Sequence, residues 1–174
     1  MSGEGAEKAA QESKTFATHP YYSAIATKID VQDADAVQRM VERVVSEFGR
    51  IDYVINSAGV IASSHSSNCI ADAVFKISGS SSAPIQHLKI DDFDRLLSTN
   101  LRGTMLCVRA VSKQMALQEP RQYSPQGRHA SASRSLGRGV IINLGSIASL
   151  RAAPGMTGYV ASKHAVVGLT KVAG

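Results

Sequence analysis

The chain has 174 residues and a mass of 18.4 kDa, which is enough for one compact domain. With 44% hydrophobic residues, 19% charged residues and a mean hydropathy of -0.05, the composition supports an apolar core and excludes a wholly disordered protein. The two cysteines, Cys69 and Cys107, have neither metal-binding nor CxxC spacing, so we expect a reducing compartment and no metal site.

The net charge of +5 originates in the C-terminal third of the chain. Residues 1–119 hold 14 acidic and 12 basic residues, whereas residues 120–174 hold seven basic residues and no acid. Four of these basic residues lie in a Ser/Gly/Pro-rich stretch: Arg121, Arg128, Arg134 and Arg138. Because the stretch contains a single aromatic residue, a solvated surface loop is favoured over a nucleic-acid contact.

Membrane and export signals are absent from the sequence pattern. The first 14 residues lack the apolar segment of a leader peptide, and no apolar run approaches the roughly 18 residues of a membrane span. We therefore expect a cytoplasmic protein with no membrane partner and no nucleic-acid partner.

Helix and strand patterns alternate in the N-terminal part. A short helix is predicted over about 6–16, a strand over 22–30 and a longer helix from about 35 to 48. Apolar residues of the longer helix recur with helical spacing, namely Val37, Met40, Val41, Val44, Val45 and Phe48. Asp33 is placed to cap this helix, and Gly49 to end it.

Two further segments, 50–59 and 139–146, have the continuous apolar runs of parallel strands buried on both faces. Between them, 62–90 and 118–138 are predicted to be loops or insertions, flanking a helix that begins near Asp91. A last helix carries the sequence YVASKHAVVGLTKVAG. This alternation predicts an α/β fold with a doubly wound parallel sheet in a single domain over 1–174.

Tyr159 and Lys163 stand four residues apart on the last helix, so their side chains share one face. Such a pair arises readily by chance, but Ser146 lies thirteen residues earlier, where a predicted strand ends. Ligands of parallel sheets bind at that edge. The spacing therefore makes Ser146, Tyr159 and Lys163 candidate site residues, although a serine after a strand is more often a turn former.

Asn100 interrupts the apolar stripe of its helix, following Leu96 by four residues and Leu97 by three. A buried amide without partners costs about 1–3 kcal/mol, so this side chain needs local hydrogen bonds or a function. Spacing alone favours the structural role slightly.

Five motifs, taken together, are more specific than any one of them. They are Asp30-Val31 at a strand end, NSAG at 56–59, Asn100 in NLRGT, Ser146, and YVASK ending in Lys163. In order and spacing they resemble the short-chain dehydrogenase/reductase family, from about residue 6 to the end of the chain. NSAG departs mildly from the family's commoner NNAG, and residues 107–149 look most like fungal members.

The resemblance implies a Rossmann-like fold and a set of catalytic residues. Tyr159 would exchange a proton with the substrate oxygen, assisted by the Lys163 ammonium, which stabilises a phenolate. Ser146 would hold and polarise that oxygen, and Asn100 would support a water that links Lys163 to solvent.

The resemblance also implies a nicotinamide cofactor. Asp30 would hydrogen-bond the adenine, Asn56 would lie along the cofactor, and Tyr159 and Lys163 would reach its nicotinamide end. The residue that selects NAD or NADP follows a strand that this sequence lacks. The reductive role of similar family members favours NADP, with NAD as the other choice.

The family's TGxxxGxG turn, which holds the cofactor pyrophosphate, has no counterpart here. Gly3 and Gly5 come nearest, but no strand precedes them and Lys8 stands where the third glycine belongs. We therefore expect an incomplete fold, without its first two and its last strands, from a truncated protein.

The implied function is an NAD(P)-dependent oxidoreductase that interconverts a carbonyl and an alcohol on a small molecule, in fungal secondary metabolism, as a homo-oligomer when full length. The alternative is a catalytically silent relic or interaction module that lacks the pyrophosphate site.

Overall fold

The structure is a computed structural model that describes residues 3–61, 84–125, 133–152 and 154–174. The helices of these parts are α1 (Gly3–Thr15), α2 (Ala34–Phe48), α4 (Ile90–Leu97), α5 (Thr104–Ala116) and α6 (Thr157–Ala173). The strands are β1 (Tyr53–Asn56), β2 (Arg121–Tyr123), β3 (Arg134–Gly137) and β4 (Val140–Asn143). Single turns of 3₁₀-helix cover Ile85–His87 and Ile147–Ser149.

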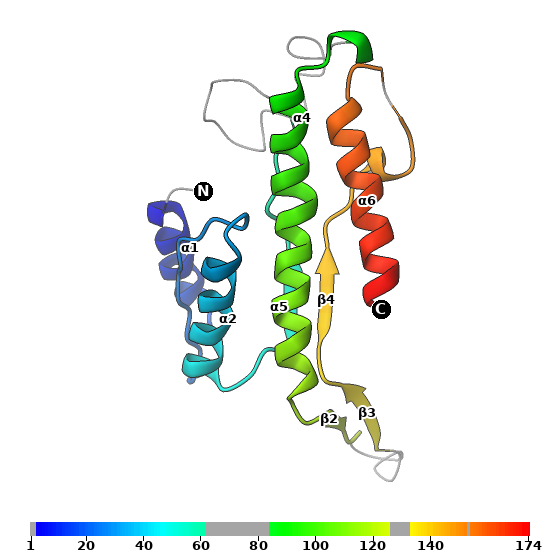
Figure 1. Ribbon diagram of the computed structural model, residues 1–174. Coiled ribbons are helices and arrows are strands. Elements are labelled where there is room, and N and C mark those ends of the chain that lie inside the picture. The colour runs from blue at the N-terminus through cyan, green and yellow to red at the C-terminus, as the bar shows by residue number, and fades with distance from the viewer. Residues whose placement is uncertain (1–2, 62–83, 126–132, 153) are drawn as a thin grey trace.

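The central sheet consists of β1 and β4, which pair in parallel with Tyr53 opposite Val140 and Asn56 opposite Asn143. The chain between the two strands passes through α4 and α5, so the connection is the helical crossover of an α/β protein. In Figure 1, α5 runs along β4, with α6 beyond the strand and with α1 and α2 on the other side of α5. The predicted α/β class with a parallel sheet is confirmed.

The core lies between this sheet, α2 and α5. Val54 of β1 and Ile141 of β4 pack against one apolar cluster, whose buried members are Val41, Ile51, Val111 and Met115. A second cluster of Val37, Leu106 and Cys107 continues it toward Ile29 and Val31. Gln118 closes the end of α5, because its side-chain amide accepts from the Ile51 N–H and donates to the Ile51 carbonyl.

One face of the central sheet is exposed, which corrects the prediction of strands buried on both faces. Tyr53 and Ile55 are 67% and 62% exposed, and Val140 and Ile142 are each 46% exposed. Alternate residues of a strand point to opposite faces, and among the described residues the packed elements cover only the face that carries Val54 and Ile141.

The strand predicted over 22–30 is wrong, since residues 23–30 form neither strand nor helix. An extended segment becomes a strand only through ladder hydrogen bonds, and the ladders in the described parts of the chain join β1 to β4 and β2 to β3. Side chains hold the segment instead, because Arg43 donates to the Thr27 hydroxyl and Ile29 packs on the second cluster.

Part of the predicted loop 118–138 is an antiparallel hairpin of β2 and β3. Both strands are solvent-exposed along their whole length, and the Arg134 guanidinium lies 5.5 Å from the centre of the Tyr123 ring. The hairpin projects from the lower end of the molecule in Figure 1. Most of the other predicted loop, 62–83, lies outside the described residues, as does Cys69.

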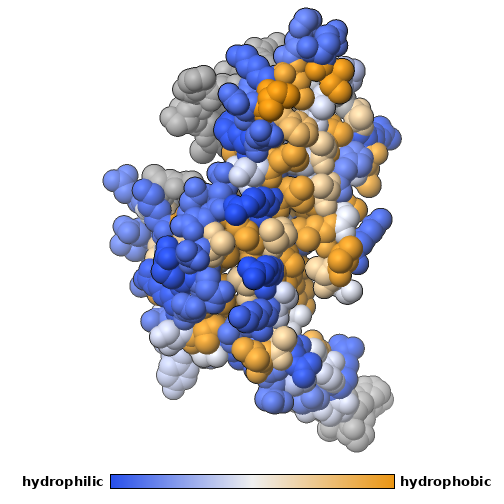
Figure 2. Space-filling view, viewed as in Figure 1, coloured by the Kyte–Doolittle hydropathy of each residue, from blue (hydrophilic) through white to orange (hydrophobic). Residues whose placement is uncertain are grey.

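No helix in the described ranges is both long enough and apolar enough to cross a membrane. On the face seen in Figure 2, apolar side chains gather over α5 and α6, whereas α1 and α2 present mainly hydrophilic ones. The helices also differ in burial, because α1 buries none of its residues and α5 buries six.

Candidate active site

A π-helix separates α4 from α5, where the apolar periodicity predicted one continuous helix. It covers Ser98–Gly103 and has Asn100 at its centre. π-Helical insertions are rare and occur often at functional sites, because they displace backbone groups from the regular ladder. Asn100 is 1% exposed, so its amide must find partners inside the protein.

The Asn100 amide donates both of its side-chain hydrogens and accepts one hydrogen bond. Its Oδ1 accepts from the Val60 N–H at 2.7 Å, and its Nδ2 donates to the Val60 carbonyl at 2.8 Å and to the Ser162 hydroxyl at 3.0 Å. The Thr104 hydroxyl donates to the backbone carbonyl of Asn100. The amide therefore joins the segment after β1 to α6, which is the structural role that spacing favoured.

Lys163 lies one turn after Tyr159 on α6 and is 9% exposed. Its Nζ donates to the Leu144 carbonyl at 2.8 Å and lies 5.8 Å from the centre of the Tyr159 ring. Burial lowers the pKa of Lys163 from its ordinary value. The two side chains predicted to form a pair are thus brought together, next to the carboxyl end of β4.

Ser146 begins the 3₁₀ turn that follows β4. Its Oγ accepts from the Ala148 N–H at 3.2 Å, while its own N–H donates to the Ser149 hydroxyl at 3.0 Å. An Oγ held as an acceptor leaves its proton available to donate to another oxygen. The turn packs against α6, so Ser146 stands on the same side of the sheet edge as the helix of Tyr159 and Lys163.

Gly59 lies between the two polar centres. A Cβ at this position would stand 3.2 Å from Oδ1 of Asn100 and 3.9 Å from Nζ of Lys163. Glycine thus permits the close approach of this loop to both side chains. The NSAG motif therefore contributes a steric fit as well as polar groups.

Asn56 ends β1, and its Nδ2 donates to Oδ1 of Asn143 at the end of β4. Asn143 in turn donates to the Thr170 hydroxyl of α6. The carboxyl ends of the two strands are therefore linked to each other and to α6. This is the edge of the sheet where Asn56 is predicted to lie along the cofactor.

Asp30 is exposed, and its side chain makes a local hydrogen bond rather than one to another predicted site residue. Its Oδ1 accepts from the Gln32 N–H, which makes a turn. This turn is hydrogen-bonded to the π-helix, because Gln32 accepts hydrogen bonds from Ser98 and Arg102. Gly103 permits this contact, since a Cβ there would stand 2.7 Å from Cγ2 of Val31.

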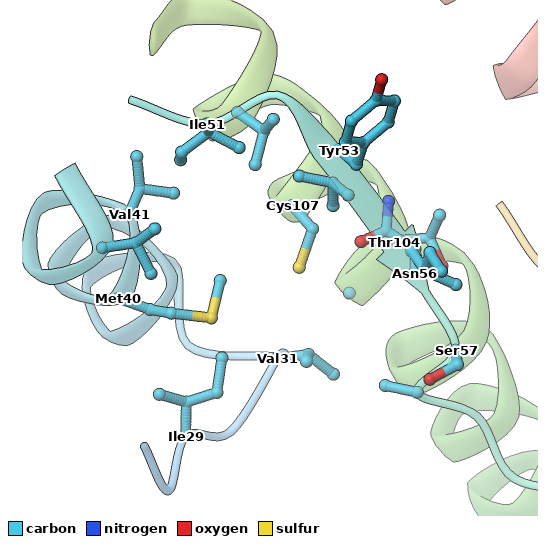
Figure 3. A pocket seen from close by; sticks show the side chains of 16 residues that line it. Ile29, Val31, Met40, Val41, Ile51, Tyr53, Asn56, Ser57, Thr104 and Cys107 are labelled. Carbon is cyan, nitrogen blue, oxygen red and sulfur yellow. The ribbon is translucent and has the colours of Figure 1, made fainter. Parts of the chain in front are cut away.

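A cavity of about 380 Å³ lies between the 29–31 segment, α2, β1 and α5. Its walls are mainly apolar, and Met40 and Cys107 direct their sulfur atoms into it (Figure 3). Burial raises the pKa of the Cys107 thiol, which therefore remains protonated. Of the predicted residues only Asn56 reaches the cavity wall, so this space is distinct from the Tyr159/Lys163 centre.

The motifs singled out Tyr159, Lys163, Ser146 and Asn100, but sequence reasoning missed their partners. Ser162, Ser149 and the Leu144 carbonyl hold these residues in place. Ser162 and Gly59 stand inside recognised motifs, which was the only signal that pointed to them. The contact of Lys163 with a backbone carbonyl 19 residues away has no sequence signature.

Comparison with known proteins gives concordant matches. A family model described as short chain dehydrogenase matches residues 1–174. The short-chain dehydrogenase anuF of Penicillium roqueforti is 36% identical over 170 residues, which are 98% of this chain and 54% of that protein. The chain thus spans about half the length of the curated relatives that it matches.

Two solved structures extend the likeness to three dimensions. The crystal structure of NAD+-bound xylitol dehydrogenase has a TM-score of 0.70 and 27% sequence identity, over 98% of this chain and 50% of that one. The structure of ElxO with NADP bound has a TM-score of 0.59 and 28% identity, over 84% of this chain and 45% of that one.

Proposed function

Because the chain belongs to the short-chain dehydrogenase family, we propose that the protein is an NAD(P)-dependent oxidoreductase that interconverts a carbonyl and an alcohol on a small molecule. The observation that supports this most directly is the buried Lys163 ammonium beside the Tyr159 ring, held by the Leu144 carbonyl at the carboxyl end of β4. A role in fungal secondary metabolism belongs to the same proposal, and the likeness to the Penicillium short-chain dehydrogenase supports its fungal part.

The polar groups of Lys163, Asn56 and Asp30 suit the two nucleoside ends of a dinucleotide. Lys163 has donors beyond the one used by Leu144, and the Asn56 amide lies at the shared edge of β1 and β4. Asp30 is exposed and uses one carboxylate oxygen for its own turn, which leaves the other for the amino group of an adenine. Bound there, the nicotinamide would supply or accept a hydride.

Proton transfer falls to Tyr159. In reduction its hydroxyl gives a proton to the substrate oxygen, and in oxidation it takes one from the alcohol. The ammonium of Lys163 stabilises the resulting phenolate through its charge, at a distance of 5.8 Å from the ring centre. Ser146 donates its free proton to the same substrate oxygen and so polarises the carbonyl.

Asn100 would act on Lys163 through a water rather than on the substrate directly. Both side-chain N–H groups are used by Val60 and Ser162, so a water would donate to an oxygen of Asn100, such as the backbone carbonyl that already accepts from Thr104. Such a water would link Lys163 to solvent, so that the proton that Tyr159 gives up in reduction can be replaced.

The alternative is a catalytically silent member of the family. One observation favours it: within the described residues no strand, glycine turn and helix follow one another, and Gly3 and Gly5 are part of α1. Lys8, at the third position of the motif, pairs with Glu12 instead. The described residues therefore fit the nucleoside ends of a dinucleotide and do not fit its pyrophosphate.

Replacing Tyr159 by Phe tests the proposal. We expect Tyr159→Phe to lower carbonyl reduction by about 100-fold or more while NAD(P)H binding changes only a few-fold, because the hydroxyl acts in the transition state. Activity is measured as NAD(P)H consumption over a panel of small ketones and aldehydes, and binding by cofactor fluorescence.

Tyr53→Phe is the matched control, since Tyr53 is an exposed residue of β1 and should keep the unmodified rate. A Tyr159→Phe protein with more than about a tenth of the rate would disprove the acid/base role. A protein that neither binds NAD(P)H nor reduces any carbonyl would favour the silent alternative.

A further inference from the structure

Ser162 is the most completely buried polar side chain of the described residues, with 0% exposure. It stands between Tyr159 and Lys163 in sequence, yet it faces the π-helix. Its Oγ donates to the Tyr159 carbonyl at 2.8 Å and accepts from Nδ2 of Asn100 at 3.0 Å. Both hydrogen-bonding roles of the hydroxyl are therefore defined by partners of known direction.

The hydroxyl completes a chain of hydrogen bonds across three elements. The backbone of Val60, after β1, hydrogen-bonds both the oxygen and the nitrogen of the Asn100 amide, and these two bonds define which end carries the oxygen. The remaining N–H of that amide has Ser162 as its acceptor. The chain thus runs from the Val60 backbone through Asn100 and Ser162 to the backbone of Tyr159.

We propose that Ser162 is a positioning residue, an inference that rests on the proposed function. Its hydrogen bonds fix where the turn of α6 that carries Tyr159 and Lys163 lies along the π-helix. Lys163 follows Ser162 directly, and its Nζ must reach the Leu144 carbonyl while it passes Gly59. A small rotation or slide of α6 would change the distance between the Lys163 ammonium and the Tyr159 ring.

Apolar packing and the hydrogen bonds of Ser162 act on α6 in different ways. Where α6 begins, Gly158 lies close to Leu96 and Phe93 of α4, since a Cβ there would stand 2.8 Å from Cδ1 of Leu96. A hydrogen bond between two buried groups is directional, and breaking it leaves the Asn100 N–H without a partner. The Ser162 hydroxyl therefore restricts α6 more sharply than a methyl group of similar size.

Amide hydrogen exchange on the 174-residue chain tests the hydrogen-bonded link between Asn100 and Ser162. The experiment needs neither cofactor nor turnover. The Val60 N–H donates to Oδ1 of Asn100, so its exchange reports on that side chain. We expect Ser162→Ala to accelerate Val60 exchange about tenfold or more while Val111, in the core of α5, is unchanged. Ser112→Ala is the matched control, because Ser112 also donates to the carbonyl three residues before it but is exposed.

Unchanged Val60 exchange in Ser162→Ala, or an equal acceleration at Val60 and Val111, would overturn the proposal. Should Ser162→Ala fail to fold, Ser162→Cys retains a weaker acceptor in nearly the same volume and should accelerate Val60 exchange to a smaller extent. A Val60 exchange rate in Ser162→Cys equal to that of the wild type would also overturn the proposal.

Turnover provides the second readout. In the active protein, Ser162→Ala should lower kcat about tenfold and move the pH profile of kcat, whereas Ser112→Ala should change neither. An unmoved pH profile would overturn the positioning role even if kcat falls. Loss of the proposed function would appear instead as an inactive unmodified protein, while the exchange result at Val60 would still stand.

Discussion

Lys163 combines a buried position with one hydrogen-bond acceptor among the described residues, the Leu144 carbonyl. The ammonium loses water on folding, and this burial lowers its pKa. Below the lowered pKa, both the folded and the unfolded chain carry the proton. Between the lowered pKa and the unfolded value of about 10.4, only the unfolded chain retains it. The contribution of Lys163 to folding stability therefore becomes more favourable as the pH rises through this interval.

This residue-scale argument predicts a pH-dependent difference between wild type and Lys163→Met. The Tm of the wild type relative to that of Lys163→Met should rise as the pH increases from the lowered pKa to about 10.4, because methionine has no proton to release. Thermal melts followed by circular dichroism at matched pH values measure it. Titration of Cys107 and of exposed groups occurs in both proteins and cancels. A difference that stays constant or falls would contradict the buried ammonium.

Among the elements, α2 shows how a local signal defines a helix. Asp33 has extended backbone angles, and its Oδ1 accepts from the Asp35 and Ala36 N–H groups. Gly49 ends the helix with a φ of 80°, in the left-handed region that glycine adopts without strain. Both features lie within one turn of the helix ends, as the sequence indicated.

We expect Asp33→Ala to lower the free energy of unfolding by about 1 kcal/mol, because two helix N–H groups lose their acceptor. Asp33→Asn separates this cap from the ion pair with Arg39, which is 3.8 Å long and solvent-exposed. Asparagine caps as well as aspartate, so its loss should stay within a few tenths of a kcal/mol. Urea denaturation provides the comparison, and equal losses in both variants would assign the effect to charge.

For the whole molecule, the exposed face of the central sheet is the main consequence of its architecture. Ile55 is 62% exposed, whereas its neighbour Val54 packs on the cluster around Val41 and Val111. The two residues stand on one strand and face opposite sides. Their environments therefore differ although their sequence contexts are nearly the same.

Substitution by threonine distinguishes the two faces of the sheet. Val54→Thr should destabilise the chain by about 1 kcal/mol or more, since it places a hydroxyl in the apolar cluster. Ile55→Thr should change stability by less than about 0.5 kcal/mol. Denaturation of the 174-residue chain measures both. Equal losses would show that the face carrying Ile55 is also packed in solution.

The sequence by itself determined the elements whose signals are local. Helix α2, the strands β1 and β4 and the face shared by Tyr159 and Lys163 follow from periodicity, caps and four-residue spacing, which act within a few residues. The resemblance of the five motifs also led to the family that the comparisons identify. Their roles in catalysis stay predictions until the variants above are measured.

Only the tertiary structure decided the features that need a distant partner. Residues 23–30 have a strand-like pattern but no ladder partner in the described structure, and the apolar pattern of β1 could not reveal that one of its faces is exposed. Ser162, one partner of Asn100, is 62 residues away in sequence, and Leu144, the partner of Lys163, is 19 residues away. Hydrogen bonds between such residues depend on how the helices pack, and packing sums many contacts that no local pattern specifies.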